Sequence, residues 1–132
     1  MNRIMKCALL VIKNNKILLQ VEKKQDKLLL PGGKPTKGED HLVCLKREIR
    51  EELNSEIDED SLKYLGKFED IAADGKSMLT VMLYTGELLT KPKPSNEVKR
   101  LVWFGMKGNH DRLSPVIRNQ LMPYLKAVRL IR

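Results

Sequence analysis

The sequence lacks any long apolar run. No segment approaches the roughly 18 consecutive apolar residues that a membrane-spanning helix needs. The opening MNRIMKCALLVIKNNK passes into a charged turn without the small-residue cleavage site of a secretory signal. We therefore expect a cytoplasmic protein that does not associate with membranes.

Cysteine and histidine are also scarce, with two of each. Cys7 and Cys44 lie in apolar segments and form no C-x-x-C pair, which excludes a disulfide scaffold and predicts reduced, packed thiols. Nothing beside Cys44 would activate a thiolate. His41 and His110 lack the clustered partners of a histidine metal site, so we expect surface polar residues.

Aromatic residues make up only 5% of the chain, whereas the formal net charge is +8. Nucleic-acid binding uses clustered cations with aromatic residues among them, but the Lys and Arg residues here are scattered and often stand beside acids. The pattern therefore favours a solvated basic surface over a nucleic-acid site and leaves attraction of anionic small molecules open. For Trp103, Phe104 and Phe68, it favours core packing over base stacking.

The length of 132 residues predicts one domain, 1–132, because single cores commonly comprise ~100 to 150 residues. Hydrophobic residues form 42% of the chain and charged residues 32%, a balance typical of a globular fold. Repeats, low-complexity segments and an internal domain boundary are absent. Both a monomer and a homodimer are compatible with these features.

Apolar runs separated by turn signals predict a strand-rich chain. The pairs Asn14–Asn15 and Asp74–Gly75 each lie between two apolar runs and predict hairpins. The segments PGGKPTKGED and KPKPSN are rich in Gly or Pro and predict loops. The expected strand segments are residues 4–22, folded as a hairpin, 27–31, 62–73, 77–89 and 100–105.

Two helices complete the predicted elements. The first extends from Asp40 to Leu53, and Asn54 offers a left-handed stop. Its apolar stripe, at spacings of three and four, consists of Leu42, Leu45, Ile49 and Leu53. The second begins at Ser114–Pro115, with Pro123 as a kink or break. Because hairpins dominate, we expect an α+β domain with a mixed sheet flanked by the helices.

The first predicted helix carries three carboxylates, Glu48, Glu51 and Glu52, on less than two turns. Like charges this close repel one another and call for a compensating cation. Oxygen ligands suit a hard cation such as Mg2+, and the preceding Gly32 and Gly33 allow the backbone to approach a metal or phosphate. Taken alone, the cluster is equally compatible with a solvated helix face.

The joint spacing of these residues is more specific than either feature alone. Gly33 is followed after five residues by Glu39, and Glu39 after seven residues by REIREE, residues 47–52. This pattern resembles the signature of Nudix hydrolases, written G-x5-E-x7-R-E-U-x-E-E-x-G-U, where U is bulky and aliphatic. At the end of the signature, Asn54 and Ser55 replace the glycine and the aliphatic residue, and every carboxylate is retained.

The resemblance covers most of the chain and implies an α/β/α sandwich whose members hydrolyse linked nucleoside diphosphates with a divalent cation. It implies a ligand or general-base role for Glu48 and for Glu97, with Glu69 and Asp70 as weaker acidic candidates. The implied catalytic residues are Arg47, Glu48, Glu51 and Glu52. The implied metal ligands are the Gly32 carbonyl, Glu48, Glu51, Glu52 and Glu97, and the implied orienting residues are Gly33, Glu39 and Arg47.

The spacing around PGGK and EVKRLVWF looks most like the small, MutT-like nucleotide-cleaning branch. That branch implies cleavage of ordinary or modified (d)NTP to NMP and pyrophosphate with Mg2+, for which Mn2+ can substitute. A polar residue near the start of the last helix can read the base there, and the nearest position in this chain is Leu113. The candidate substrate-binding residues are Asn109, Asp111, Ser114, Asn119 and Phe68.

Other functions compatible with the resemblance are hydrolysis of ADP-ribose, a nucleotide sugar or a dinucleotide. A Nudix fold that only binds a nucleotide or a protein is a further alternative, but it predicts damaged carboxylates in the signature, whereas all of them are intact. A third alternative, an RNA-binding or RNA-decapping role, draws on the net charge of +8. The leading expectation is a Mg2+-dependent nucleotide pyrophosphohydrolase.

Overall fold

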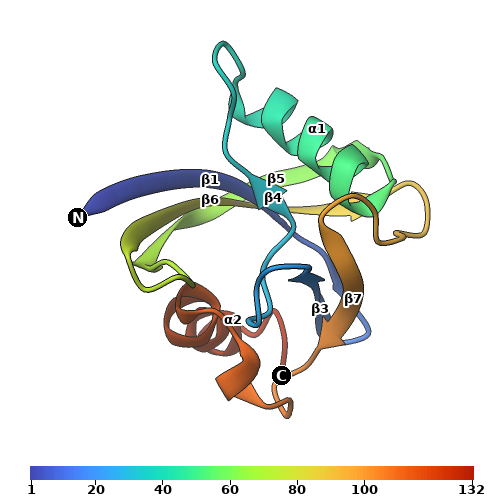
Figure 1. The fold of residues 1–132 in the computed structure, drawn as a ribbon. Coiled ribbons are helices and arrows are strands. Elements are labelled where there is room, and N and C mark those ends of the chain that lie inside the picture. The colour runs from blue at the N-terminus through green and yellow to red at the C-terminus, as the bar shows by residue number, and fades with distance from the viewer.

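Two sheets and two α-helices form the computed structural model, which describes residues 1–132 (Figure 1). The strands are β1 (Asn2–Leu10), β2 (Ile12–Lys13), β3 (Lys16–Glu22), β4 (Gly32–Gly33), β5 (Ile57–Ile71), β6 (Ser77–Leu88) and β7 (Val98–Phe104). The helices are α1 (His41–Leu53) and α2 (Met122–Ala127), with a 3-10 turn at His110–Arg112 and a π-helical turn at Ile117–Leu121. No helix combines the length and the apolar character needed to cross a membrane.

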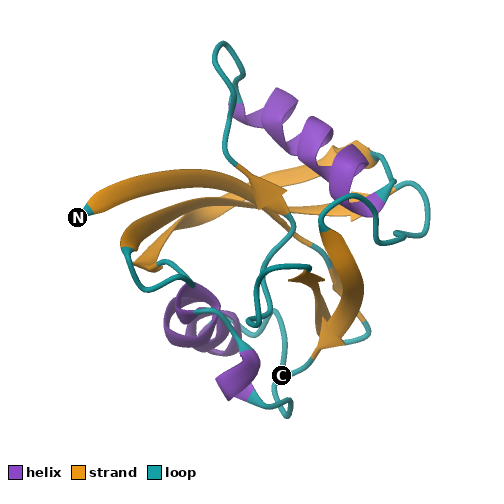
Figure 2. Cartoon of the chain, viewed as in Figure 1, coloured by secondary structure: helices purple, strands orange, loops and turns teal.

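The larger sheet is mixed. Its strand order is β4-β1-β6-β5, with β1 and β6 parallel and the other pairs antiparallel. Strands β2, β3 and β7 form a second, antiparallel sheet. Figure 2 shows α1 on one side of the larger sheet and α2 on the other. The predicted α+β fold, with a mixed sheet flanked by helices, is confirmed.

Strand β1 contributes to a core on each side of the sheet. Cys7 and Leu9, with Val11 just after the strand, pack in the cluster that contains the buried face of α1, whereas Ala8 and Leu10 pack in the cluster beneath the C-terminal helical region. Successive side chains of a strand point to opposite faces, and both faces here are covered. The continuous apolar run of β1 is therefore fully buried from residue 7 onward.

Both cysteines are free and buried on the α1 side, as predicted. The Cys44 thiol donates a hydrogen bond of 3.5 Å to the backbone oxygen of Gly33. Burial raises the pKa of both thiols, that of Cys44 to about 12. The structure therefore agrees with two packed, unactivated thiols.

The predicted limits of α1 are confirmed by its caps. Asp40 accepts a hydrogen bond of 2.9 Å from the backbone N–H of Val43, and Asn54 ends the helix in the left-handed conformation with φ of 47°. The predicted apolar stripe is wrong at Leu42, which is 40% exposed. Its side chain borders a surface hollow that Tyr64 and Tyr84 also line, and is not part of the core.

The predicted hairpin over residues 4–22 is wrong in its pairing. Strand β1 pairs in parallel with β6, and the chain passes at Val11 into the second sheet. Within residues 4–22, only β2 and β3 form a hairpin, whose turn residues Asn14 and Asn15 have positive φ values of 52° and 64°. Parallel pairing joins segments far apart in the chain, so the local pattern could not reveal it.

Other segments differ from the predicted boundaries. Residues 27–31 are not a strand, and make only isolated bridges at Leu28 and Leu29. The predicted loop contains β4, because Gly32–Gly33 pairs with β1. Strand β5 begins at Ile57, earlier than the predicted residue 62.

The C-terminal helical region starts after Ser114, as predicted, and continues through Pro123. Proline lacks a backbone N–H, so an unbroken α-helical hydrogen-bond ladder cannot pass through it. The helix widens into the π-helical turn just before Pro123, where the Met122 N–H donates to the Ile117 oxygen. The predicted kink or break is thus replaced by a π-helical turn.

Candidate active site

Glu52 is the most deeply buried of the three carboxylates on α1, with 8% of its surface exposed. Its Oε1 accepts a hydrogen bond of 2.8 Å from the backbone N–H of Gly32, and its Oε2 accepts one of 3.0 Å from the Gln20 side chain. Burial raises the pKa of Glu52 to about 8, against the lowering effect of these two hydrogen bonds. A buried carboxylate without a cationic partner is costly, so the site favours an added cation.

Two residues of β3, Gln20 and Glu22, join this cluster and were missed by sequence reasoning. Gln20 is completely buried, and its Nε2 donates both to Glu52 and, over 3.1 Å, to Glu22. The Oε1 of Gln20 is the one buried side-chain polar atom without a hydrogen-bond partner. A sequence signal for them exists, because residues 20 and 22 are both polar in a largely apolar strand and, two positions apart, point to the same face.

Arg47 connects the other acids of the site. Its guanidinium forms a two-pronged ion pair with Glu39, with distances of 2.7 and 2.9 Å, and contacts Glu48 at 2.8 Å and Glu51 at 3.3 Å. The Arg47 hydrogen bonds lower the pKa of Glu39 to about 2. For the half-buried Glu48, burial raises the pKa against the effect of Arg47. Arg47 therefore holds Glu39, Glu48 and Glu51 in one arrangement.

Gly33 leaves the space in which the Glu48 carboxylate lies. A Cβ atom at position 33 would stand 2.5 to 2.7 Å from the three carboxyl atoms of Glu48. We expect Gly33→Ala to displace this carboxylate and lower kcat by about 10²-fold, because a misplacement near 1 Å has that effect on catalysis. Steady-state kinetics on purified variants measures it.

Gly105→Ala is the matched control for this change. A Cβ atom there makes only an ordinary contact of 3.4 Å with the flexible Lys16 side chain. We expect wild-type kinetics for this variant and a wild-type circular dichroism spectrum for both. A fully active Gly33→Ala enzyme would contradict the placement of Glu48 in the reaction.

The oxygen-rich donor set fits a hard divalent cation. Glu48, Glu52 and the Gly32 backbone are the groups that would hold it, and Glu51 stands at the exposed edge. No three acidic, histidine or cysteine side chains already converge as a metal cage. Glu48 and Glu51 instead face Arg47, and Glu52 faces Gln20 and Gly32.

Raising the pH is expected to destabilise the metal-free protein through Glu52. The pKa of this carboxyl rises from its ordinary 4.5 to about 8 on folding, so the folded state holds an extra proton between these values. The corresponding stability is complete below about pH 4.5 and is lost as the pH rises through about 8. Thermal unfolding in EDTA should show wild type losing stability relative to Glu52→Gln over this range.

Glu87→Gln, at an exposed position, controls for the loss of one negative charge. Its stability should follow that of wild type at every pH. Parallel curves for wild type and Glu52→Gln would contradict the raised pKa of Glu52.

Two adjoining hollows, of about 30 and 200 Å3, open beside this cluster. One is lined by Gly32 and the other by Glu22 and Lys34, which connects both to the Glu52 network. The walls that they share come from β1, β6 and the segments around residues 29 and 115: Lys6, Leu29, Leu79, Ser114 and Val116. Apolar walls with a few polar groups are typical of small-molecule sites.

Ser114 is the predicted substrate-binding residue that the structure places in these hollows. Asn119 lies outside them and donates a hydrogen bond of 3.1 Å to Asp70. Burial would raise the pKa of Asp70, but its hydrogen bonds from Gln120, the Ile71 N–H and Asn119 lower it. Asn119 thus ties the C-terminal helical region to β5.

The remaining predicted substrate residues also make contacts elsewhere. Asn109 caps the 3-10 turn through the N–H of Asp111, and Asp111 forms an exposed ion pair with Arg118 at 3.0 Å. Phe68 packs edge-on against Tyr124, with ring centroids 5.4 Å apart. None of these residues lines the two hollows beside Glu52.

The backbone of Glu97 lies near the cluster of Glu52, Gln20 and Glu22. Its carbonyl oxygen accepts a hydrogen bond of 3.0 Å from the N–H of Lys23, next to Glu22. The same loop is bound to the last turn of α1, because the Ser95 N–H donates to the Glu52 backbone oxygen over 3.0 Å. Glu69 instead accepts a hydrogen bond from Thr80 on the exposed face of the sheet.

The predictions for histidines and aromatic residues need correction. His41 and His110 are half-buried, and each has a ring nitrogen 2.8 Å from an oxygen, the Tyr84 hydroxyl for His41 and the Met106 carbonyl for His110. Phe104 is a core residue, as expected, but Trp103 is 38% exposed. Neighbouring strand residues face opposite sides, and Phe104 packs in the core on its side of β7 whereas Trp103, on the other side, stays partly exposed.

Comparison with known proteins identifies the family. The family model for the NUDIX domain matches residues 4–123. The chain belongs to the Nudix family. It is accordingly a Nudix hydrolase, which acts on phosphoric anhydride bonds.

Several solved structures share the fold. A nudix hydrolase family member from Chromobacterium violaceum is 25% identical, with a TM-score of 0.73 over 95% of this chain and 78% of that one. The E. coli ORF135 protein is 24% identical, with a TM-score of 0.72 over 98% and 94%. A MutT NUDIX hydrolase from Burkholderia pseudomallei is 23% identical, with a TM-score of 0.68 over 86% and 88%. Comparison with curated proteins finds no match.

Proposed function

We propose that this Nudix hydrolase is a Mg2+-dependent pyrophosphohydrolase that converts a nucleoside triphosphate, ordinary or modified, to NMP and pyrophosphate. The observation that carries the proposal is the connection between the buried Glu52 carboxylate and the two hollows. Gly32 lines one hollow and donates to Glu52, while Glu22 lines the other and is joined to Glu52 by Gln20. A substrate seated there would place its phosphates beside Gly32 and Glu22, the two groups that connect the hollows to Glu52.

The hollows carry groups for both parts of a nucleotide. Lys6 and Lys34 supply positive charge for a polyphosphate, and the apolar side chains of Leu29 and Val116 offer a surface for a base. Ser114 adds a hydroxyl that can hydrogen-bond the base or sugar. This distribution supports the binding of one nucleotide.

A bound divalent cation would screen the phosphate charge and lower the pKa of the attacking water. Glu52 and the Gly32 backbone, which would hold the cation, are kept in a fixed arrangement by the 2.8 Å hydrogen bond between them. Glu48 is the proposed proton acceptor, because burial raises the pKa of its carboxyl and so increases its basicity. Arg47 orients Glu48 and Glu39, and Glu97 is a further proposed ligand or base from the adjacent loop.

Product analysis on a substrate panel tests the proposal. Ordinary and oxidised nucleoside triphosphates, ADP-ribose, nucleotide sugars, dinucleotides and capped RNA would be incubated with Mg2+, Mn2+ or EDTA. The expected result is metal-dependent formation of NMP and pyrophosphate from a triphosphate. Preferential cleavage of ADP-ribose, a nucleotide sugar or a dinucleotide would contradict the proposed triphosphate substrate and favour that compound class instead. Binding without cleavage of any compound would contradict the proposal of an enzyme.

A further inference from the structure

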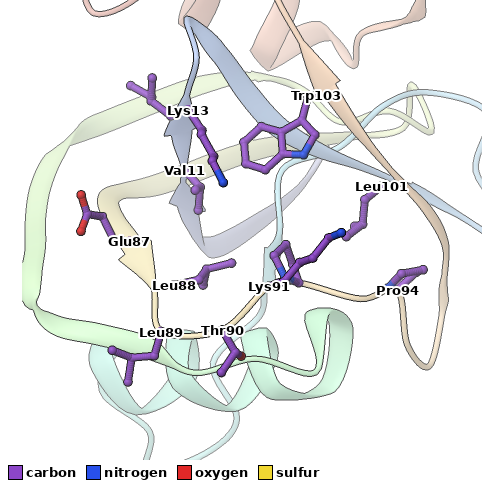
Figure 3. A pocket seen from close by; sticks show the side chains of 12 residues that line it. Val11, Lys13, Glu87, Leu88, Leu89, Thr90, Lys91, Pro94, Leu101 and Trp103 are labelled. Carbon is purple, nitrogen blue, oxygen red and sulfur yellow. The ribbon is translucent and has the colours of Figure 1, made fainter.

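A larger hollow, of about 860 Å3, opens between the start of the second sheet, the end of β6 with its following loop, and β7 (Figure 3). Its lining includes Val11, Lys13, Lys91, Leu101 and Trp103, and contains none of the Nudix-box residues. The volume is within the range of roughly 300 to 1,000 Å3 typical of small-molecule sites. The family assignment does not account for this hollow.

Trp103 forms an aromatic wall of the hollow. It is the single tryptophan of the chain, and 38% of its surface is exposed. Val11 and Leu101 stand on either side of it as apolar walls (Figure 3). An exposed indole between apolar walls provides a platform on which a flat aromatic ring can stack.

Two cations share this space. The side chains of Lys13 and Lys91 extend over the hollow, and the Glu87 carboxylate turns away from the indole (Figure 3). Neither lysine forms an ion pair within the chain. Their ammonium groups are therefore available to an anionic ligand such as a phosphate.

The wall opposite β7 is held in position before any ligand binds. Pro92 and Pro94 restrict the backbone of the loop after β6. The N–H of Lys93, between the two prolines, donates to the backbone oxygen of Leu53 over 2.8 Å. The N–H of Ser95, after them, donates to the backbone oxygen of Glu52 over 3.0 Å. A preformed wall lowers the ordering cost of binding.

We propose that this hollow is a second nucleotide-binding site, which takes a free nucleotide with its base on Trp103 and its phosphates between Lys13 and Lys91. The combination of one aromatic platform and two unpaired cations matches one nucleotide unit. Single-stranded RNA is bound over several successive bases and needs a series of such platforms, whereas this hollow has one. The proposal is independent of the substrate cleaved at the carboxylates.

Trp103 itself reports occupancy of the site, because its fluorescence is the only tryptophan signal of the protein. AMP and ATP would be titrated separately into the full chain in EDTA, which prevents metal-dependent turnover. The expected result is saturable quenching. The variant Lys13→Glu with Lys91→Glu should weaken the apparent Kd about tenfold or more, because it replaces both phosphate-binding charges by repelling ones.

Lys63→Glu with Lys107→Glu is the matched control, since it makes the same charge change at exposed positions outside the hollow. Its Kd should stay within about twofold of wild type, and both double variants should retain wild-type hydrolysis rates as evidence of an intact fold. Absence of saturable quenching, or equal weakening in both double variants, would overturn the proposal. Tighter binding of a short RNA than of ATP, with the same dependence on Lys13 and Lys91, would overturn the free nucleotide as ligand.

Discussion

Glu52→Gln is expected to lower kcat by about 10³-fold with saturating metal, because it removes one negative charge from the carboxylates proposed to hold the cation. The side chain keeps its shape, and its oxygen can still accept from the Gly32 N–H. The fold should therefore persist, and above neutral pH the metal-free variant should be the more stable protein, because burial opposes the charge on Glu52. Steady-state kinetics and thermal unfolding measure the two effects separately.

Glu48→Gln should show a kinetic loss of the same order with the fold retained. Glu56→Gln provides the matched control, because Glu56 is an exposed acid just beyond α1 that pairs only with Arg50. Its kcat should equal that of wild type. Near wild-type turnover in both Glu48→Gln and Glu52→Gln would reject the proposed active site.

Gly32→Ala is expected to produce the largest loss of stability. A Cβ atom at this position would lie 2.1 Å from the backbone oxygen of Cys7 and 2.7 Å from the Cα of Ala8, and the φ angle of +146° already disfavours a side chain. Both contacted atoms belong to β1, which is paired on both edges and cannot move aside. We expect a loss of about 3 kcal/mol or more and a fall in Tm of about 10 °C or more.

Gly38→Ala distinguishes the effect of a steric clash on stability from the effect of a positive φ angle. Gly38 also has a positive φ, of +86°, but a Cβ atom there would meet nothing within 4 Å. Urea unfolding should show a loss of only about 1 kcal/mol for this variant. Equal losses in the two variants would show that backbone strain, and not close packing of β4 on β1, determines the requirement for glycine at position 32.

The helix of the active site was predictable because its signals are local. Asp40 and Asn54 mark the two ends, and the spacing of Glu48, Glu51 and Glu52 places them together on any α-helix. The buried stripe was correctly identified except at Leu42, which borders a surface hollow. A helix pattern describes a face, whereas burial depends on what covers that face.

The surroundings of the carboxylates were not predictable in the same way. Gln20 lies 32 positions before Glu52, and only the meeting of β3 with α1 brings them within hydrogen-bond distance. The parallel pairing of β1 with β6 likewise joins residues about 75 positions apart, as in Asn2 with Ser77. Contacts of this kind leave no periodic signal within one segment.

The sequence by itself determined the Nudix family, the α+β class and the acidic edge of α1, because identities, spacings and helical periodicity are properties of short segments. Only the tertiary structure decided that Glu52 is buried against Gly32 and Gln20, that Ser114 shares a hollow with Lys6, and that Trp103 stays exposed. These features depend on which distant segments pack together, and packing sets the desolvation, hydrogen bonding and accessibility from which chemistry follows.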